Sequence, residues 1–208
     1  EKTIKFKNLS FSYDNENFIF KKINLTINKS EKIMISGPSG TGKSTLVELL
    51  TGLNLPNSGQ ILIDDIDLKD CNKKEWLNGI GFVGQKNILF NKSIKENILD
   101  GYQSASNEMY EKALKVSRTF DFLEENNISD EEIIVQGQDN FSGGQLKRIS
   151  IARALVKNPM LLILDEATNE FDKILEKKII NEIINNYQNM TIIFISHNLE
   201  IKKFCTRS

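Results

Sequence analysis

Cysteine is scarce in this chain of 208 residues, and long runs of apolar residues are missing. The two cysteines, Cys71 and Cys205, are too few for a disulfide framework and fit a reducing compartment. The longest apolar run, Met160 to Leu164, is far too short to span a bilayer. The sequence therefore excludes a disulfide-stapled secreted domain and predicts no transmembrane helix within this stretch.

An excess of charge of either sign is also missing. The chain has 27 basic and 28 acidic residues, for a net charge of −1, and no block of like charge stands out. Because nucleic-acid-binding domains carry a basic patch or stripe, we expect no nucleic-acid partner. The content of 39% hydrophobic and 26% charged residues is ordinary for a globular protein of one large domain or of a domain with an inserted subdomain.

A glycine-rich stretch lies between an apolar run and the start of a helical pattern. It reads Gly37-Pro38-Ser39-Gly40-Thr41-Gly42-Lys43-Ser44-Thr45. A strand before such a stretch and a helix after it are the context that a phosphate-binding loop requires. Glycines let backbone N–H groups converge on phosphate oxygens, and the helix N-terminus adds positive potential. A plain glycine-rich turn is the alternative, and both flanks argue against it.

Two side chains of this loop have predicted roles. Lys43 would reach the β- and γ-phosphates of a nucleoside triphosphate, and the Ser44 hydroxyl would bind Mg²⁺. The loop by itself predicts only that a nucleoside triphosphate binds, so the rest of the chain must indicate the use made of it.

Apolar periodicity predicts an α/β fold. Alternation at residues 3–6 and 23–27 predicts a small antiparallel sheet near the start. Met109, Ala113, Val116 and Phe120 recur at helical spacing and predict one apolar helix face.

Two later apolar segments, residues 160–164 and 191–196, read as continuous buried strands with helical patterns between and before them. Pro159 closes the helix that precedes the first of these strands. Strands of this kind, flanked by helices, predict a parallel sheet covered on both faces.

Two acids end the first of these strands. Asp165 is placed to hold Mg²⁺, directly or through water, and Glu166 to orient or deprotonate the attacking water. Ligand sites of α/β sheets lie at the carboxyl ends of the strands. The alternative is that acids stand there only because strands must end in water.

A second glycine-containing segment, Phe141-Ser142-Gly143-Gly144-Gln145, opens another helical pattern. Ser142 can cap that helix, and the paired glycines allow close backbone approach to an anion. A simple Ser-Gly-Gly turn is the alternative. Residues 37–45 and 141–145 would thus form two anion cradles. If two copies of the chain meet head to tail, the cradle at residues 141–145 of each would close on the γ-phosphate held by the cradle at residues 37–45 of the other.

These residues carry a family resemblance. The chain resembles the nucleotide-binding domain of an ATP-binding-cassette (ABC) transporter over essentially its whole length. Residues 37–45 are similar to the Walker A motif, and residues 161–166 to the Walker B motif with its catalytic glutamate. Residues 141–145 resemble the signature Leu-Ser-Gly-Gly-Gln, with Phe in place of Leu. The resemblance implies an Mg²⁺-dependent ATPase in which ATP lies between Walker A of one subunit and the signature of the other.

The resemblance also implies roles for four further residues. Gln85 matches the glutamine that contacts Mg²⁺ and water, with a solvated loop residue as the alternative. His197, the only histidine, matches the switch histidine that binds the γ-phosphate. Tyr13 matches the aromatic residue that stacks on adenine, unless it packs on the first sheet. Asp172 ends the segment that matches the D-loop, where Asn169-Glu170-Phe171 departs from the usual Ser-Ala-Leu.

The fold implied is a P-loop NTPase core with a parallel sheet flanked by helices, an N-terminal antiparallel β subdomain and an inserted α-helical subdomain. We expect residues 1–85 and 158–208 to form the ATP-binding core and about 86–157 the helical signature subdomain of a single domain. Because the chain starts at Glu1 without methionine, we expect it to be an excerpt of a longer chain with an N-terminal transmembrane domain.

The segments 57–63 and 89–98 resemble the exporter pattern within the family. The resemblance therefore implies the ATP-driven engine of an exporter, at the cytoplasmic face of the cell membrane. Its expected partners are a second such domain, in a homodimer or a paired assembly, and the transmembrane domain. The alternative is a soluble ABC ATPase that acts on nucleic acid or ribosomes, and the charge balance opposes it.

Overall fold

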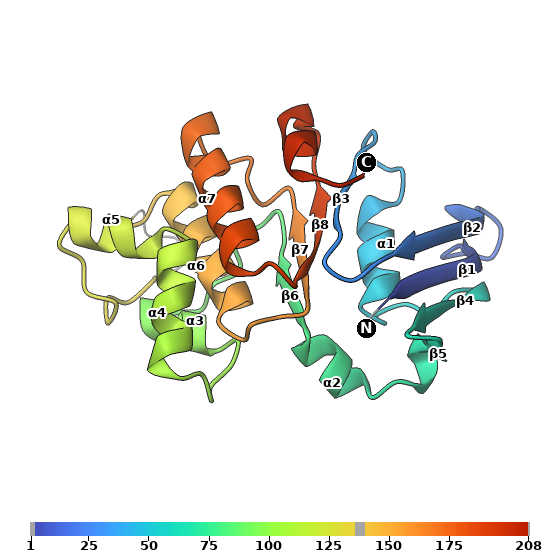
Figure 1. Cartoon of the computed structure of the whole chain (residues 1–208), viewed down its shortest axis with the longest axis horizontal. Coiled ribbons are helices and arrows are strands. Elements are labelled where there is room, and N and C mark those ends of the chain that lie inside the picture. Colours follow the sequence, from blue (N-terminus) through green and yellow to red (C-terminus); the bar gives the residue numbers. More distant parts are fainter. Residues whose placement is uncertain (1–2, 136–139, 208) are drawn as a thin grey trace. The chain divides into compact units, whose positions relative to one another are not determined.

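The structure is a computed structural model that describes residues 3–135 and 140–207 (Figure 1). The chain divides into two compact units. Unit 1 comprises residues 1–80 and 191–208, and unit 2 comprises residues 81–190. The predicted boundaries of the core and of the signature subdomain, at residues 85 and 158, stay predictions.

Unit 1 contains the predicted antiparallel sheet, with strand order β2-β1-β4-β5. These strands are β1 (Ile4–Phe11), β2 (Phe20–Ile27), β4 (Ser58–Ile63) and β5 (Ile66–Asp67). Strand β1 pairs antiparallel with both β2 and β4. Phe6 and Leu9 on β1 and Ile61 on β4 are buried, so this sheet contributes one apolar face to the core of unit 1.

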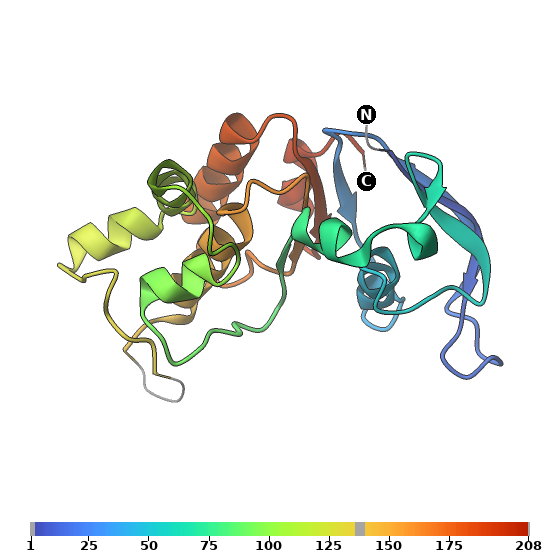
Figure 2. The ribbon, with the colours of Figure 1, turned by 90° about the horizontal axis from the view of Figure 1, so that it is seen from below.

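The second pair of strands in unit 1 is parallel. Strand β3 (Lys32–Ile35) pairs with β8 (Thr191–Ile195) in a register that sets Ile35 opposite Ile195. Helix α1 (Lys43–Leu50) lies between these strands and the antiparallel sheet, and Figure 2 shows it nearly end-on. Its apolar residues Leu46, Val47, Leu49 and Leu50 are buried there.

Three short helices complete unit 1: η1 (Leu68–Asp70), α2 (Lys73–Asn78) and η2 (Leu199–Phe204). Trp76 on α2 is buried, and its indole N–H donates to the carbonyl of Leu50 at 2.8 Å. The only tryptophan of the chain therefore has a structural role, because it satisfies a carbonyl at the end of α1.

Unit 2 is mainly helical. Strands β6 (Ile80–Val83) and β7 (Leu161–Asp165) are neighbours in a sheet. The helices are α3 (Ile94–Leu99), α4 (Asn107–Val116), α5 (Thr119–Glu125), α6 (Gly143–Leu155) and α7 (Lys173–Asn186). Helix α6 contacts α3, α4 and α5, and α4 also contacts α7. In residues 3–135 and 140–207, no helix is both long enough and apolar enough to cross a membrane.

Helix α6 is the centre of unit 2. Ile149, Ile151, Ala152 and Leu155 are all fully buried, although they point to different sides of the helix. A helix that is buried on most of its circumference is a core helix. The predicted end before Pro159 is confirmed, since α6 stops at Leu155.

The single helix face predicted through Met109 and Phe120 was wrong at its end. Helix α4 ends at Val116, and Arg118 has a left-handed backbone with φ 60°. The Ser117 hydroxyl lies 2.7 Å from that of Thr119 and donates to the carbonyl of Leu114, which competes with continuation of the helix. Phe120 is therefore 38% exposed on α5, while Phe122 takes the buried position.

Candidate functional site

The predicted context of residues 37–45, a strand followed by a loop and a helix, is confirmed in unit 1. Gly40 and Gly42 have φ values of 82° and 92°, a conformation that favours glycine. Gly42 is the N-cap of α1, and a Cβ at this position would collide with the side chain of Ile19. The tight loop therefore depends on glycine at both positions.

Lys43 folds over the loop that precedes it. Its ammonium donates to the carbonyls of Gly37 at 2.7 Å and Pro38 at 2.9 Å. Helix α1 has no acidic residue in its first turn, so the positive potential of its N-terminus is not offset there. Loop glycines, ammonium and helix end together fit a phosphate chain.

His197 and the loop belong to the same edge of the parallel pair in unit 1. Ile35 and Ile195 are opposite each other, so the glycine loop after β3 and His197 after β8 both leave the carboxyl ends of neighbouring strands. The Ser196 N–H donates to the carbonyl of Ile35 at 3.3 Å, which ties the two segments together at that point. His197 is exposed.

Tyr13 also lies beside the loop helix. Its hydroxyl donates to Glu48 at 2.6 Å and lies 3.2 Å from the Thr45 hydroxyl, both on α1. The hydrogen bond to the Glu48 carboxylate raises the pKa of Tyr13 above its usual value. The ring meets Phe11 edge-on but is 62% exposed. Tyr13 therefore does not pack into the sheet core, and its role in stacking on adenine stays a prediction.

Asp165 and Glu166 lie where the sequence predicts them in unit 2. Asp165 is the last residue of β7, and Glu166 follows it with a left-handed φ of 51°. Such a conformation costs free energy in a non-glycine residue and is common at functional sites. The Asn169 side chain donates to the Glu166 carboxylate at 3.3 Å and so helps to orient it.

The segment from Phe141 to Gln145 opens α6 as predicted. Ser142 is the N-cap: it accepts from the N–H of Gln145, whose side chain accepts from the N–H of Ser142 in return. Ser142 and Gly143 are exposed, whereas Phe141 is buried with its ring edge-on to Phe122. The Phe141 side chain is therefore a packing group, and the residues after it face outward.

The loop after β6, which carries the exposed Gln85, is held by side chains that sequence reasoning missed. The ammonium of Lys147 on α6 donates to the carbonyls of Gly84 at 2.9 Å and Gln85 at 2.8 Å. Arg153, also on α6, donates to the carbonyl of Ile88 at 2.7 Å. Burial lowers the pKa of Lys147, although Glu170 opposes that shift.

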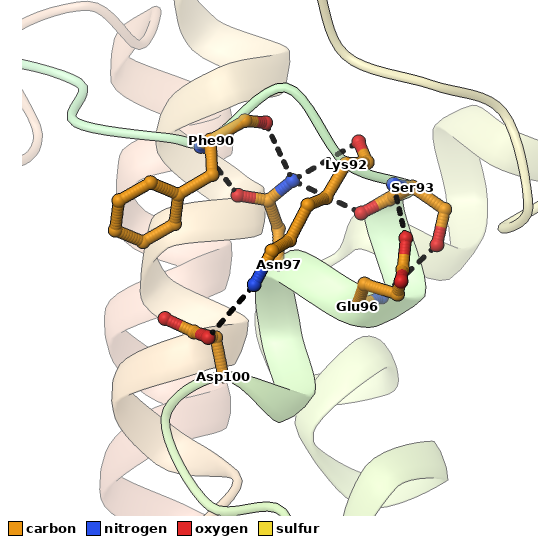
Figure 3. A network of polar contacts seen from close by, with 6 residues as sticks. All are labelled: Phe90, Lys92, Ser93, Glu96, Asn97 and Asp100. Carbon is orange, nitrogen blue, oxygen red and sulfur yellow. Dashed lines mark hydrogen bonds and ion pairs between the residues drawn. The ribbon is translucent and has the colours of Figure 1, made fainter.

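Asn97 on α3 fixes the next part of this loop (Figure 3). Its carbonyl oxygen accepts from the N–H of Phe90 at 2.8 Å, and its amide donates to the carbonyls of Phe90, Lys92 and Ser93 at 3.0–3.2 Å. Figure 3 also shows Ser93 and Glu96 closing the capping box of α3. Asn97 is fully buried, and nothing in the sequence indicates this beyond the resemblance of the segment 89–98 to the exporter pattern.

Asp172 is the N-cap of α7 and accepts from the N–H groups of Leu175 and Ile174. These bonds lower the pKa of the Asp172 carboxyl, and the bond from Leu175 has the larger effect. The side chain is exposed, so this capping role leaves room for the interface role that the family resemblance implies.

The structure thus gathers the predicted residues into two groups. Unit 1 holds the loop 37–45, Tyr13 and His197, and unit 2 holds Gln85, the segment 141–145, Asp165, Glu166 and Asp172. Among residues 3–135 and 140–207, no cluster of three or more His, Cys, Asp or Glu side chains could hold a metal. The predicted Mg²⁺ ligands are instead hard oxygen donors of three kinds, from Ser44, Gln85 and Asp165, and these suit Mg²⁺ together with phosphate.

Comparison with known proteins decides the family. A sequence profile described as "ABC transporter" matches residues 20–169, more than half of the chain. The chain belongs to the ABC transporter family. It is 42% identical over 206 residues to the alpha-hemolysin translocation ATP-binding protein HlyB of Escherichia coli O157:H7. It is 38% identical over 207 residues to the ATP-dependent lipid A-core flippase of Desulfotalea psychrophila.

A solved structure shares the fold of this ABC transporter family member. A bacterial Atm1-family ABC exporter with ATP bound matches 96% of the chain with a TM-score of 0.89 and 32% sequence identity. The predicted α/β fold class is therefore confirmed. The chain spans 29% of the length of HlyB, 36% of that of the flippase and 35% of that exporter chain.

Proposed function

We propose that the chain binds and hydrolyses ATP with Mg²⁺ and thereby drives an ABC exporter. The observation that carries this proposal is the pair of anion cradles at two helix N-termini, the glycine loop before α1 and the exposed signature before α6. Membership in the ABC transporter family and the likeness to an exporter with ATP bound support it.

In this proposal, unit 1 binds the nucleotide. The N–H groups of residues 37–45 and the ammonium of Lys43 hold the β- and γ-phosphates, for which Lys43 leaves the loop carbonyls it now contacts. The exposed ring of Tyr13 stacks on adenine. Ser44, Gln85 and Asp165 would hold Mg²⁺, which neutralises charge that develops on the phosphate oxygens.

Hydrolysis in this proposal depends on three polar side chains. Glu166 orients and deprotonates the attacking water, and its backbone strain and its bond from Asn169 fix the carboxylate in advance. Gln85 and His197 position that water and the γ-phosphate. His197 leaves the same strand edge as the glycine loop, and this register supports its role.

The signature acts on the nucleotide of a second chain. Ser142 and Gly143 are exposed at the start of α6, and an anion there would meet N–H groups at a helix N-terminus. Two chains placed head to tail, as a homodimer or with a related domain, would enclose two ATP molecules. Closure on ATP and reopening after hydrolysis would move the transmembrane partner, at the cytoplasmic face of the membrane. The relatives that are named for translocation or lipid flipping support this coupling.

The substitution Glu166→Gln tests the proposal. It keeps the size of the side chain but removes the base, so we expect kcat for ATP hydrolysis to fall by about 100-fold or more. The ATP-bound dimer should then accumulate, which size-exclusion chromatography with light scattering would detect with Mg-ATP but not with Mg-ADP.

A matched control is Glu182→Gln on α7, where the carboxylate accepts from the Asn186 amide in the same helix. This control should hydrolyse ATP like the parent chain. Normal hydrolysis by Glu166→Gln would remove Glu166 from the role of base, and a parent chain without any Mg-dependent hydrolysis would refute the proposed activity.

A further inference from the structure

A charged cluster in unit 2 connects the loop after β6, the signature at residues 141–145 and the segment 169–171. Lys147 on α6 is fully buried, with its side chain 0% exposed. A buried ammonium is costly unless it is hydrogen-bonded and paired with an opposite charge. Here two of its three donors bind the carbonyls of Gly84 and Gln85, and its charge partner is Glu170 at 3.7 Å.

Glu170 connects this lysine to the signature. Its carboxylate accepts from the Asn87 amide at 3.2 and 3.3 Å, and the same amide donates to the carbonyl of Gly143 at 3.3 Å. A Cβ on Gly143 would collide with the Glu170 carboxylate, so this carboxylate covers the backbone of the first signature glycine. The loop after β6 that carries Gln85 and Asn87, which we call the glutamine loop, is therefore tied to the signature through Asn87 and Glu170.

The backbone around Glu170 continues the contact. The Glu170 carbonyl and the Phe171 ring lie within van der Waals distance of a Cβ built on Gly144, at 3.5 and 3.7 Å. Glu170 belongs to the segment 169–171, where the chain departs from the Ser-Ala-Leu of the family pattern. An alanine at this position would have no carboxylate for Lys147 or Asn87.

We propose that Asn87, Lys147 and Glu170 form a clasp that sets the glutamine loop, the signature and the D-loop segment in one alignment for hydrolysis. The three residues are positioning residues, since they act through Gln85, Gly143 and the segment that ends at Asp172. The inference rests on the proposed ATPase function and deepens it. It also gives the unusual D-loop sequence of this chain a specific purpose.

Because Lys147 and Glu170 are an ion pair, we expect the single and double substitutions at these two residues to differ in their effects. Glu170→Ala removes the ion-pair partner of the buried Lys147 ammonium, although the weaker attraction of Asp165 remains, and this costs more free energy than removing both members of the pair. Lys147→Gln removes the charge but retains N–H donors for the two carbonyls, and the partly exposed Glu170 carboxylate remains solvated and bound to Asn87. The double variant Lys147→Gln/Glu170→Ala contains neither charge and should perform better than Glu170→Ala alone.

The test measures steady-state ATP hydrolysis by these three variants, with ATP affinity as a check on the folded fraction. For Glu170→Ala we expect kcat to fall about tenfold while KM for Mg-ATP stays within about twofold, because misalignment affects the reaction and not the phosphate loop. The kcat of the double variant should be at least threefold higher than that of Glu170→Ala. Glu182→Ala, which also removes a carboxylate that accepts from an asparagine amide, is the matched control and should keep the parental kcat.

A second measurement does not depend on hydrolysis. Hydrogen–deuterium exchange of the nucleotide-free chain should show faster exchange at residues 84–90 and 168–172 in Glu170→Ala, and slower exchange again in the double variant. If Glu170→Ala fails to fold, Glu170→Gln replaces it, since it keeps the size and one acceptor for Asn87. Equal exchange and equal kcat in Glu170→Ala and Glu182→Ala, or losses that simply add in the double variant, would overturn the clasp. A parent chain without hydrolysis but with the predicted exchange pattern would refute the ATPase and leave the clasp standing.

Discussion

The contacts of the Lys43 ammonium in unit 1 explain how this residue can bind a phosphate. Its ammonium binds two carbonyls of its own loop, at 2.7 and 2.9 Å, instead of an acidic side chain. A neutral carbonyl attracts an ammonium less than a phosphate does, because the phosphate oxygens carry net negative charge and the carbonyl only a dipole. Lys43 is thus held close to the loop by partners that a triphosphate can displace.

At the residue scale, Lys43→Met should weaken ATP binding by about 10- to 100-fold, the equivalent of one lost charged hydrogen bond. The apolar stem is kept, so the melting temperature should change by only a few degrees. Isothermal titration calorimetry with ATP checks the affinity. Lys69→Met, which removes an exposed ammonium paired with Asp67, is the control and should bind ATP normally. Unchanged ATP affinity in Lys43→Met would place the phosphates elsewhere.

Single residues also show where sequence reasoning stops. The residues of 37–45 could be predicted because their spacing reflects a backbone geometry at Gly40 and Gly42 that glycine adopts far more readily than other residues. Lys147 could not be found in this way, because a lysine in a helix is normally solvent-exposed. Only the burial of α6 on most of its circumference reveals that its ammonium lies inside unit 2.

Short elements in unit 2 are positioned by polar side chains rather than by apolar area. Helix α3 has six residues, which is too short to be stable alone, and its capping box and Asn97 tie it to the preceding loop. The loop from Gly84 to Ser93 is in turn held by Lys147, Arg153 and Asn97. The position of the glutamine loop therefore depends on hydrogen bonds to its carbonyls.

At the element scale, Asn97→Ala should lower the free energy of unfolding by about 2–4 kcal/mol, because it leaves several buried backbone groups of the loop without partners. Urea denaturation followed by circular dichroism measures the difference. Asn126→Ala is the control, since its side-chain amide donates to the carbonyl of Phe122, which is one bond where Asn97 makes four, and its loss should cost less than about 1 kcal/mol. Equal losses in the two variants would contradict the anchoring role of Asn97.

Elements were easier to predict from the sequence than the breaks between them. The strands β7 and β8 and the helix α6 follow directly from apolar runs and from Pro159. The break between α4 and α5 was missed, since it depends on the Ser117 hydroxyl and on the left-handed conformation of Arg118. Neither leaves a trace in the apolar periodicity.

On the scale of the whole molecule, the sequence indicates two anion cradles, and the fold assigns one to each compact unit. The signature residues Ser142 and Gly143 are exposed, as an interaction with a second chain requires. The family and the α/β fold could be predicted because both cradles are local motifs. The cargo of the proposed exporter could not be predicted, since the motifs in residues 37–45 and 141–145 concern the nucleotide and the chain spans only about a third of its relatives.

A mixing experiment tests most directly whether two chains share each ATP. Lys43→Met disables the phosphate loop, and Ser142→Arg blocks the signature by its bulk and charge, so neither variant should hydrolyse ATP alone. A mixed dimer would contain one complete site, with the loop of one variant and the signature of the other. We predict that mixing the two restores Mg-ATP hydrolysis to a sizeable fraction of the parental rate. A mixture that remains as inactive as its separate components, while Ser142→Arg still binds ATP and Glu166→Gln still dimerises, would contradict the shared site.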